Sequence, residues 1–152
     1  NVKMKDIELK SVDEEDVQFT FDLYQLRDKR EKAETITLES QKTFIKNYVN
    51  DKSVFESWVI VYVDKEKAGT LSLRHSNGEL GYYFLPKFQN KGIASISMKK
   101  FLKINPKEYY TVIVDNYNTH SMHFIEKLGF NRNGIQYKIE SENIPTDIQN
   151  EE

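Results

Sequence analysis

The residues best suited to chemistry lie where a strand ends and a glycine-containing loop leads directly into a helix. This segment reads Leu85-Pro86-Lys87-Phe88-Gln89-Asn90-Lys91-Gly92-Ile93-Ala94-Ser95. Backbone N–H groups in the first turn of a helix have no intrahelical partner, and the helix dipole favours negative charge there. Gly92 has no Cβ to block a phosphate, and the small Ala94 and Ser95 keep the first turn open. The segment therefore indicates an anion site, although a single glycine before a helix is also typical of a plain connector.

Two better-known phosphate loops are excluded at this position. No Gly-Lys-Ser/Thr follows a glycine-rich turn, so the segment is not a Walker A loop. The strands before it form an antiparallel meander rather than a βαβ unit, so it is not a dinucleotide fingerprint.

The charged residues around this segment are all positive. From residue 80 to residue 107 there are six Lys and no Arg, Asp or Glu, so the rest of the chain, whose total is −2, carries −8. Such a run is typical of a solvated lysine face on a helix, and it is also consistent with a binding site for a small polyanion. The six are Lys87, Lys91, Lys99, Lys100, Lys103 and Lys107.

The composition is that of one ordinary folded domain. The chain has 152 residues, 38% apolar and 30% charged, which is enough to bury a core. It has no Cys, so disulfides, thiolate metal sites and cysteine nucleophiles are excluded. A net charge of −2 argues against nucleic-acid binding, and no apolar run approaches the roughly 20 residues that span a bilayer. We therefore expect a cytoplasmic protein that binds neither nucleic acid nor membrane.

The spacing of apolar residues predicts the order β-α-α-β-β-β-α-β-α-β, a mixed α/β domain around one sheet. Asp13 and Thr37 are expected to cap the first two helices. Asn77-Gly78 supplies the positive φ angles of a tight hairpin in the meander, and Gly129 ends the last helix. The expected strands are 4–10, 58–63, 68–74, 79–85, 109–114 and 134–140, and the later helices are 93–102 and 119–128. We expect one domain at 1–140 and an acidic, flexible tail at 141–152.

Two motifs in this order resemble the signatures of the GNAT acetyltransferase superfamily. Gln89-Asn90-Lys91-Gly92-Ile93-Ala94 is similar to the family's pyrophosphate loop, Q/R-x-x-G-x-G/A. Asn118-Thr119-His120-Ser121 and then Glu126-Lys127-Leu128-Gly129-Phe130 are similar to its N-x-x-S and E-K-L-G-F runs. The stretch 79–86 resembles the RimJ/RimL-type branch, which acetylates protein N-termini and other amines. The resemblance implies the GNAT fold, with one central, mostly antiparallel twisted sheet and helices on both faces.

The resemblance also implies acetyl-CoA as co-substrate and assigns residues to it. Backbone groups of one strand would pair with the pantetheine arm like an added strand, splaying that strand from its neighbour. N–H groups of 89–95 would hold the pyrophosphate, Asn118 would bind the pantetheine, and Lys127 is either a contact to the adenosine end or a solvated lysine. The expected cofactor-binding residues are Tyr82, Tyr83, Phe84, Gln89, Asn90, Lys91, Gly92, Ile93, Ala94, Ser95, Asn118 and Lys127.

Two catalytic residues follow from the same resemblance. An alkyl ammonium must lose a proton before it attacks a thioester, and Glu79 stands where RimL-type enzymes carry a glutamate; a solvated hairpin residue is its alternative role. A backbone N–H near Phe84 is the expected donor to the oxyanion. Many GNAT enzymes protonate the leaving thiolate with a Tyr directly before E-K-L-G-F, but this chain has Ile125 there. Ser121 is the expected replacement, and ordinary helix-start hydrogen bonding is its alternative role.

These residues predict an N-acetyltransferase in which a primary amine attacks acetyl-CoA directly in a ternary complex. The alternatives are a catalytically silent acyl-CoA-binding domain and an acyltransferase that uses a longer acyl group. The acceptor is expected to be a small molecule or a peptide amine: a polyamine, an aminoglycoside, a protein N-terminus or an amino sugar, bound partly by the loop at 30–35. We expect no metal, because His120 and His123 lack a third ligand. Trp58 with the pair Tyr82 and Tyr83 could form an aromatic cage for a cationic substrate, but Trp58 is expected to pack in the sheet. A homodimer is left open.

Overall fold

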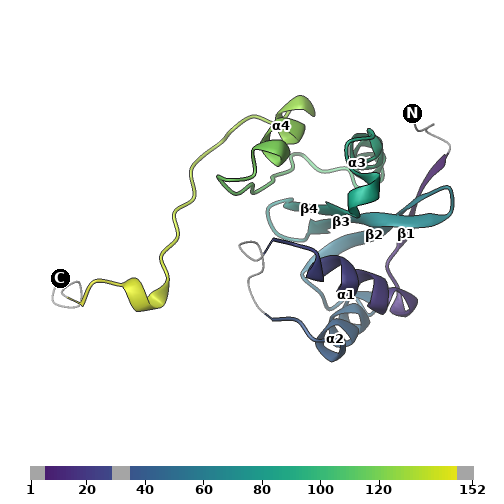
Figure 1. The fold of residues 1–152 in the computed structure, drawn as a ribbon, viewed down its shortest axis with the longest axis horizontal. Coiled ribbons are helices and arrows are strands. Elements are labelled where there is room, and N and C mark those ends of the chain that lie inside the picture. The colour runs from purple at the N-terminus through teal and green to yellow at the C-terminus, as the bar shows by residue number, and fades with distance from the viewer. Residues whose placement is uncertain (1–5, 29–34, 147–152) are drawn as a thin grey trace.

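The fold is built on an antiparallel sheet whose strands lie side by side in chain order (Figure 1). The computed structural model of the chain describes residues 6–28 and 35–146. Its strands are β1 (Ile7–Ser11), β2 (Phe55–Val63), β3 (Glu66–Arg74) and β4 (Leu80–Phe84). Its helices are α1 (Val17–Gln25), α2 (Leu38–Val49), α3 (Ile93–Ile104) and α4 (Thr119–Lys127), with 3₁₀ turns η2 (Glu14–Asp16), η4 (Pro86–Phe88) and η5 (Ser141–Asn143).

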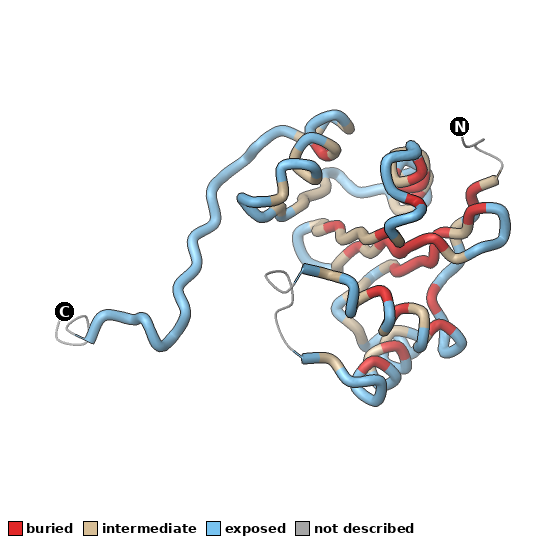
Figure 2. Tube along the Cα trace, in the orientation of Figure 1, coloured by how far each residue is buried: buried red, intermediate tan, exposed pale blue. Residues whose placement is uncertain are grey.

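Helices cover both faces of this sheet. Helices α1 and α2 lie on one face and α3 and α4 on the other (Figure 1). Successive residues of a strand point to opposite faces, so Val59 and Val61 of β2 join a core cluster with α3, whereas Trp58 and Ile60 join a second cluster with α2. Burial on both sides explains why β2 is an almost continuous apolar run, and Figure 2 shows the buried residues concentrated in the sheet and the inner helix faces.

The first helices begin as the sequence predicts. The Asp13 carboxylate accepts the Glu15 N–H and caps η2, which runs directly into α1. Thr37 and Ser40 form a reciprocal capping box at the start of α2. Trp58 is 6% exposed and packs edge-on against three aromatic rings, so the prediction that it packs in the sheet is confirmed.

Two predicted strands are absent from the described residues, and those predictions were wrong. Segment 109–114 makes one isolated parallel bridge, between Glu79 and Thr111, and no ladder. Segment 134–140 is fully exposed, with Tyr137 89% accessible, and pairs with no strand of the described chain (Figure 2). Its Ile-Tyr-Ile alternation fits a strand, but a strand also needs a neighbouring edge for its backbone groups, and the sequence cannot show whether that edge is adjacent.

The packed body of the chain ends at Phe130, which contacts the core cluster under α3. Every residue from 131 to 146 is exposed, and this segment extends away from the sheet (Figures 1 and 2). The domain limits of 1–140 and 141–152 stay a prediction, and residues 147–152 of the expected tail lie outside the described residues.

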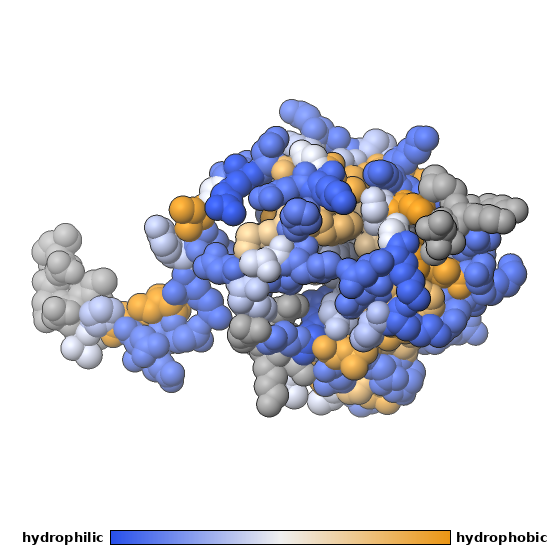
Figure 3. All heavy atoms as spheres, turned by 45° about the horizontal axis from the view of Figure 1, so that its top comes forward, coloured by the Kyte–Doolittle hydropathy of each residue, from blue (hydrophilic) through white to orange (hydrophobic). Residues whose placement is uncertain are grey.

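The face shown in Figure 3 is mainly hydrophilic, with hydrophobic residues showing in scattered patches. Among the described helices, none is long and apolar enough to cross a bilayer.

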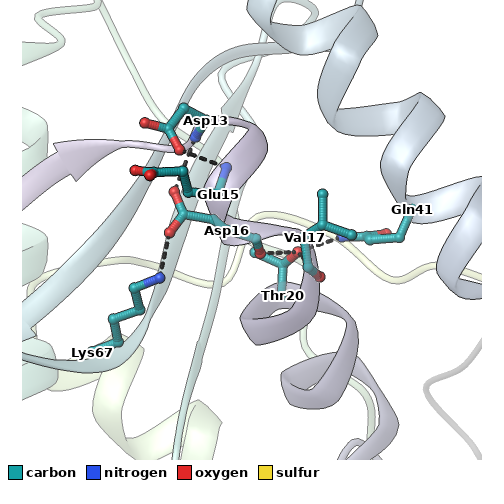
Figure 4. A network of polar contacts seen from close by, with 7 residues as sticks. All are labelled: Asp13, Glu15, Asp16, Val17, Thr20, Gln41 and Lys67. Carbon is teal, nitrogen blue, oxygen red and sulfur yellow. Dashed lines mark hydrogen bonds and ion pairs between the residues drawn. The ribbon is translucent and has the colours of Figure 1, made fainter.

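A buried polar network ties the start of α1 to the sheet and to α2 (Figure 4). The Lys67 ammonium of β3 donates to Asp16 Oδ1 at 2.7 Å, and the Asp13 N–H donates to Asp16 Oδ2 at 3.0 Å. The Thr20 hydroxyl donates to the Asp16 carbonyl at 2.9 Å and accepts from the Gln41 amide at 2.8 Å. Asp16 is 5% exposed, so its charge is compensated chiefly by Lys67.

We expect Lys67→Met to lower the free energy of unfolding by roughly 1–3 kcal/mol, because it leaves the buried Asp16 carboxylate without its cation. The value lies below that for a fully buried pair because the Lys67 side chain is 32% exposed and solvent screens part of the interaction. Urea unfolding measures the loss. Lys65→Met is the matched control: its side chain is 89% exposed and its contact to Glu8 is 3.9 Å long, so its stability should stay close to wild type.

The same contact predicts how stability depends on pH. The hydrogen bond to Asp16 raises the pKa of the Lys67 ammonium above its usual value of 10.5, against the opposing effect of burial. A pKa raised by folding contributes stability that is complete below the unfolded pKa and is lost as pH rises through the folded one. Melting temperatures measured from pH 7 to 11.5 should therefore lose this contribution above about pH 10.5. Lys67→Met should show a smaller alkaline fall than wild type, and equal falls would contradict the assignment.

Candidate active site

The start of α3 presents backbone N–H groups to solvent. Gly92 is its N-cap, with φ 79° in the left-handed region, and the first intrahelical bond runs from the Ile96 N–H to the Gly92 carbonyl at 3.1 Å. Within residues 6–28 and 35–146, the N–H groups of Ile93, Ala94 and Ser95 donate to no partner. A Cβ at Gly92 would meet no atom within 4 Å, so the space before the helix is open. This arrangement fits a phosphate-sized anion.

The loop before α3 is held in place by Gln89. Its side-chain amide donates to the Phe84 carbonyl at 2.8 Å, and its backbone N–H donates to the Pro86 carbonyl at 3.1 Å. Because the Gln89 N–H already donates to Pro86, it is not free to bind an anion in this conformation. Gln89 instead helps to position the loop. Asn90, with φ 61°, and Gly92 supply the two left-handed residues that turn the chain into α3.

Three of the six lysines between residues 80 and 107 have partners on the sheet. Lys87 pairs with Glu66 at 2.6 Å, and Lys107 pairs with Glu56 at 2.7 Å. Lys100 reaches the Ile7 carbonyl of β1 at 2.8 Å. These three lysines therefore have partners on β1, β2 and β3, and Lys91 is the lysine that lies in the loop itself.

The outer edge of β4 faces away from β3. The Leu80 N–H donates to the Thr111 carbonyl at 2.9 Å on this edge, whereas the Leu85 N–H donates to the Ala68 carbonyl on the β3 side. Because backbone groups alternate between the two edges, those of Tyr82 and Phe84 point to the outer edge with those of Leu80. Those of Tyr83 point to β3, so the expectation that Tyr83 also pairs with an added strand conflicts with the register.

The outer edge of β4 and segment 109–114 meet only at the Glu79–Thr111 bridge among the described residues. This single bridge agrees with the predicted splaying of the strand from its neighbour. An extended ligand can add to such an edge as a strand does. The N-terminus of α3 follows the other end of β4 after a short loop, so a ligand with an extended arm and a phosphate end fits both features.

Helix α4 brings Ser121 to the middle of β4. Asn118 caps this helix, its side-chain oxygen accepting the Ser121 N–H at 3.0 Å. The Ser121 hydroxyl is hydrogen-bonded to the Tyr82 hydroxyl, and the Tyr82 ring packs edge-on against Phe124 with 5.4 Å between ring centroids. Asn118 is therefore the N-cap of α4 as well as a residue of the predicted site. The contact between the Tyr82 and Ser121 hydroxyls was not predicted from the sequence, which assigns the Tyr82 backbone to the pantetheine arm and its ring to a possible cation cage.

Lys127 is exposed, and no ion pair to it is found in the part of the chain that the structure describes. Its predicted contact to the adenosine end stays a prediction.

Glu79 lies at the other end of β4, in the hairpin from β3. It is half-buried; its N–H donates to the Asn77 side chain at 3.2 Å, and its carbonyl accepts the Arg74 N–H at 2.9 Å. Side-chain alternation places Glu79 with Tyr83 on the face opposite Tyr82 and Ser121. Alternation along the strand therefore puts Glu79 and Ser121 on opposite faces of β4.

The face that carries Tyr83 is closed by the end of α1. The Tyr83 hydroxyl donates to the Leu26 carbonyl at 3.1 Å. The Arg27 guanidinium lies over the rings of Tyr24 and Tyr83, 5.4 and 5.7 Å from their centroids. The loop expected to bind the acceptor, 30–35, lies almost entirely outside the described residues.

A separate polar hollow lies near the start of α1. An open hollow of about 430 Å³ lies across β1, β2 and β3 on the α1 side and is lined by the network of Lys67 and Asp16. No group of three or more His, Cys, Asp or Glu residues that could hold a metal is found within the described chain, where His120 and His123 are exposed.

The strand edge of β4 and the unpaired N–H groups at the start of α3 are the features to compare with known folds. A family model described as the acetyltransferase (GNAT) domain matches residues 6–131. The chain belongs to the GNAT acetyltransferase family. A search of curated proteins finds no significant match.

Solved structures of N-acetyltransferases share this fold at low sequence identity. Spermidine/spermine N-acetyltransferase SpeG from Vibrio cholerae, in complex with manganese ions, is 18% identical, with a TM-score of 0.71 over 86% of this chain and 81% of that one. A dodecameric spermidine N-acetyltransferase from the same organism has 18% identity and a TM-score of 0.72 over 86% and 82%. RimL, a ribosomal L7/L12 α-N-protein acetyltransferase in complex with coenzyme A, has 18% identity and a TM-score of 0.68 over 88% and 84%. These likenesses show the GNAT fold.

Proposed function

We propose that this chain transfers an acetyl group from acetyl-CoA to a primary amine by direct attack in a ternary complex. The observation that carries the proposal is the outer edge of β4 continuing to the bare first turn of α3. Acetyl-CoA supplies a thioester, which is an acyl group activated toward amines. The chain has no Cys to carry the acetyl group covalently, which favours direct attack.

The described residues divide the binding of acetyl-CoA among three elements. The N–H groups of Ile93, Ala94 and Ser95 hold the pyrophosphate at the positive end of the α3 dipole. The backbone of β4 at Tyr82 and Phe84 orients the pantetheine arm, assisted by the Asn118 side-chain amide, whose oxygen is already occupied by the helix cap. Lys91 contributes positive charge near the pyrophosphate of acetyl-CoA. Lys127 contributes positive charge near its adenosine end.

Two side chains move protons in the proposed reaction. Glu79 accepts a proton from the bound ammonium, since alkyl ammonium groups titrate near 10 and are cations at neutral pH. Ser121 gives a proton to the departing sulfur from the other face of β4. A catalytically silent acyl-CoA-binding domain is the second candidate, and the buried Ile125 at the family's tyrosine position favours it.

The acceptor class is proposed from charge and from the neighbours' substrates. Two of the reported neighbours are spermidine N-acetyltransferases, and a third acts on a protein N-terminus. The −8 carried outside residues 80–107 favours a cationic acceptor such as a polyamine, an aminoglycoside or a basic N-terminus over an amino sugar. The cysteine-free composition fits a reducing compartment such as the cytoplasm, and we leave a homodimer open to size measurements in solution.

We expect thiol release from acetyl-CoA with at least one cationic amine when polyamine, aminoglycoside, N-terminal peptide and amino-sugar acceptors are screened spectrophotometrically. The same screen with longer acyl-CoA competitors tests whether acetyl is the preferred group. Mass spectrometry of the acceptor gives the added mass and the modified nitrogen. A protein that binds acetyl-CoA but releases no thiol with any of the four classes would favour the silent binding domain.

A further inference from the structure

A hydrogen bond between side chains joins the middle of β4 to the start of α4. The Tyr82 hydroxyl and the Ser121 hydroxyl are 39 positions apart in sequence and in direct contact, and either can be the donor. The Tyr82 ring is held by Phe124, one turn further along α4, at an interplanar angle of 62°. The contact thus joins the strand proposed to bind the thioester arm to the residue proposed to protonate its sulfur.

Ser121 is held from both its backbone and its side chain. Its N–H donates to the Asn118 side-chain oxygen at 3.0 Å, while the Met122 N–H donates to the Asn118 carbonyl at 3.1 Å. Both Ser121 and Tyr82 are half-buried, so solvent reaches the pair but does not surround it. The two hydroxyls are therefore in direct contact at a position that solvent can also reach.

A serine hydroxyl on its own is a poor acid for this step. An aliphatic alcohol does not ionise in the ordinary pH range, whereas a thiol titrates near 8.5 and a phenol near 10. The transfer of a proton from serine to a thiolate is therefore strongly unfavourable in free energy unless another group replaces the proton that serine loses. A phenol is much closer to the thiol in acidity, so a phenol behind the serine makes the transfer feasible.

We propose that Tyr82 is a positioning residue that acts through Ser121 and supplies the proton that Ser121 passes to the departing sulfur. The amine nitrogen bonds to the acetyl carbonyl carbon, and the bond from that carbon to sulfur breaks. The sulfur takes the proton of Ser121 Oγ, Oγ takes the phenolic proton of Tyr82, and water returns a proton to the phenolate. The proton lost by the amine leaves through Glu79 to solvent. This inference rests on the proposed function and adds to it that Tyr82 is the source of the proton that reaches the sulfur.

The test is Tyr82→Phe, which removes the hydroxyl and keeps the ring against Phe124. We expect kcat to fall about tenfold, less than the loss usual for a direct general acid, because a water molecule can replace the phenol behind Ser121. KM for acetyl-CoA should stay within about twofold, since an interaction made chiefly in the transition state lowers kcat. The double variant Tyr82→Phe with Ser121→Ala should be no slower than Ser121→Ala alone, because the two residues act as one unit.

A structural role of Tyr82 would not alter the pH profile in the same way. The wild-type kcat should fall at alkaline pH as the phenol ionises, and this limb should be missing in Tyr82→Phe. Replacing Tyr82 by a fluorinated tyrosine, whose phenol is more acidic, should restore activity and move the limb to lower pH. In the protein without acetyl-CoA, the NMR resonance of the Tyr82 hydroxyl proton should shift or broaden in Ser121→Ala.

Tyr48→Phe is the matched control. The Tyr48 hydroxyl accepts the Trp58 N–H at 2.9 Å on the α2 side of the sheet, so its loss should lower the melting temperature without changing kcat. Wild-type kcat in Tyr82→Phe, or additive losses in the double variant, would overturn the inference while leaving the proposed function intact. A wild-type protein that releases no thiol with any amine would overturn the proposed function, and the inference with it.

Discussion

Gly92→Asn is expected to abolish the rise in melting temperature that acetyl-CoA gives to the wild-type protein. A ligand present at 100 times its dissociation constant stabilises the folded state by about 2.7 kcal/mol, which is a shift of about 5–10 °C for a domain of this size. Gly92 lies at φ 79° with empty space around the position of a Cβ. Asn tolerates this left-handed conformation, so the variant folds but its side chain fills the space proposed for the pyrophosphate.

Gly129→Asn is the control for the cost of a side chain at a left-handed glycine. Gly129 has φ 103° after the end of α4, and a Cβ there would likewise meet nothing within 4 Å. Both variants should lose some stability without ligand, but Gly129→Asn should keep the full shift with acetyl-CoA. Calorimetric titration checks the result independently of melting. A Gly92→Asn protein that binds acetyl-CoA as tightly as wild type would remove the start of α3 from the proposed site.

The parts of the fold predicted correctly are those determined by residues close together in sequence. The Asn77-Gly78 pair predicts the hairpin between β3 and β4, and both residues adopt positive φ, 48° and 62°. The capping residues Asp13 and Thr37 predict where α1 with its 3₁₀ turn and α2 begin. The position of Gly92 before α3 predicts a helix start with open backbone donors. In each case the sequence signal and the structure that it predicts lie within a few residues of each other.

The parts missed depend on partners that are distant in sequence. Segment 109–114 has the residue types of a strand, yet it meets β4 at a single bridge, and nothing in its own sequence shows where its neighbour diverges. The lysines from 80 to 107 predict one charged face or one anion site. In the structure, however, Lys87 pairs with Glu66 on β3 and Lys107 pairs with Glu56 on β2. The pairing of Tyr82 with Ser121 also spans two elements. Its only sequence signal is that Tyr82 alternates with Leu80 and Phe84 toward the α3 and α4 face.

The register of β4 corrects one further expectation and has a chemical consequence. Three consecutive residues cannot all pair with a ligand added along one edge, because successive backbone groups point to opposite edges. Tyr82 and Phe84 face the outer edge, and the Phe84 carbonyl already accepts from Gln89 at 2.8 Å. The Phe84 N–H is then the donor on this edge nearest the loop. This is the position at which a backbone donor to the carbonyl oxygen of a bound thioester is expected.

Glu79→Gln is expected to lower kcat about 100-fold, within the usual range for loss of a general base, and to leave acetyl-CoA affinity unchanged. Gln keeps the size and polarity of Glu79, whose backbone is fixed by Asn77 and Arg74, so the hairpin should persist. The deficit should narrow as pH approaches 10, because more of the free amine is then already deprotonated. Stopped-flow or steady-state thiol release from pH 7 to 10 measures both effects.

Glu8→Gln on β1 is the matched control for this experiment. Glu8 lies at the opposite edge of the sheet and its side chain is 48% exposed, so the variant changes the net charge by the same amount without touching β4. Equal pH profiles for Glu8→Gln and wild type would show that charge alone does not alter the rate. If Glu79→Gln then also follows the wild-type profile, Glu79 is only a hairpin residue, and the proton leaves the amine by another route. The face of β4 that carries Tyr83, with Arg27 and Tyr24 around it, is where that route would be sought, because side-chain alternation puts Glu79 on the same face.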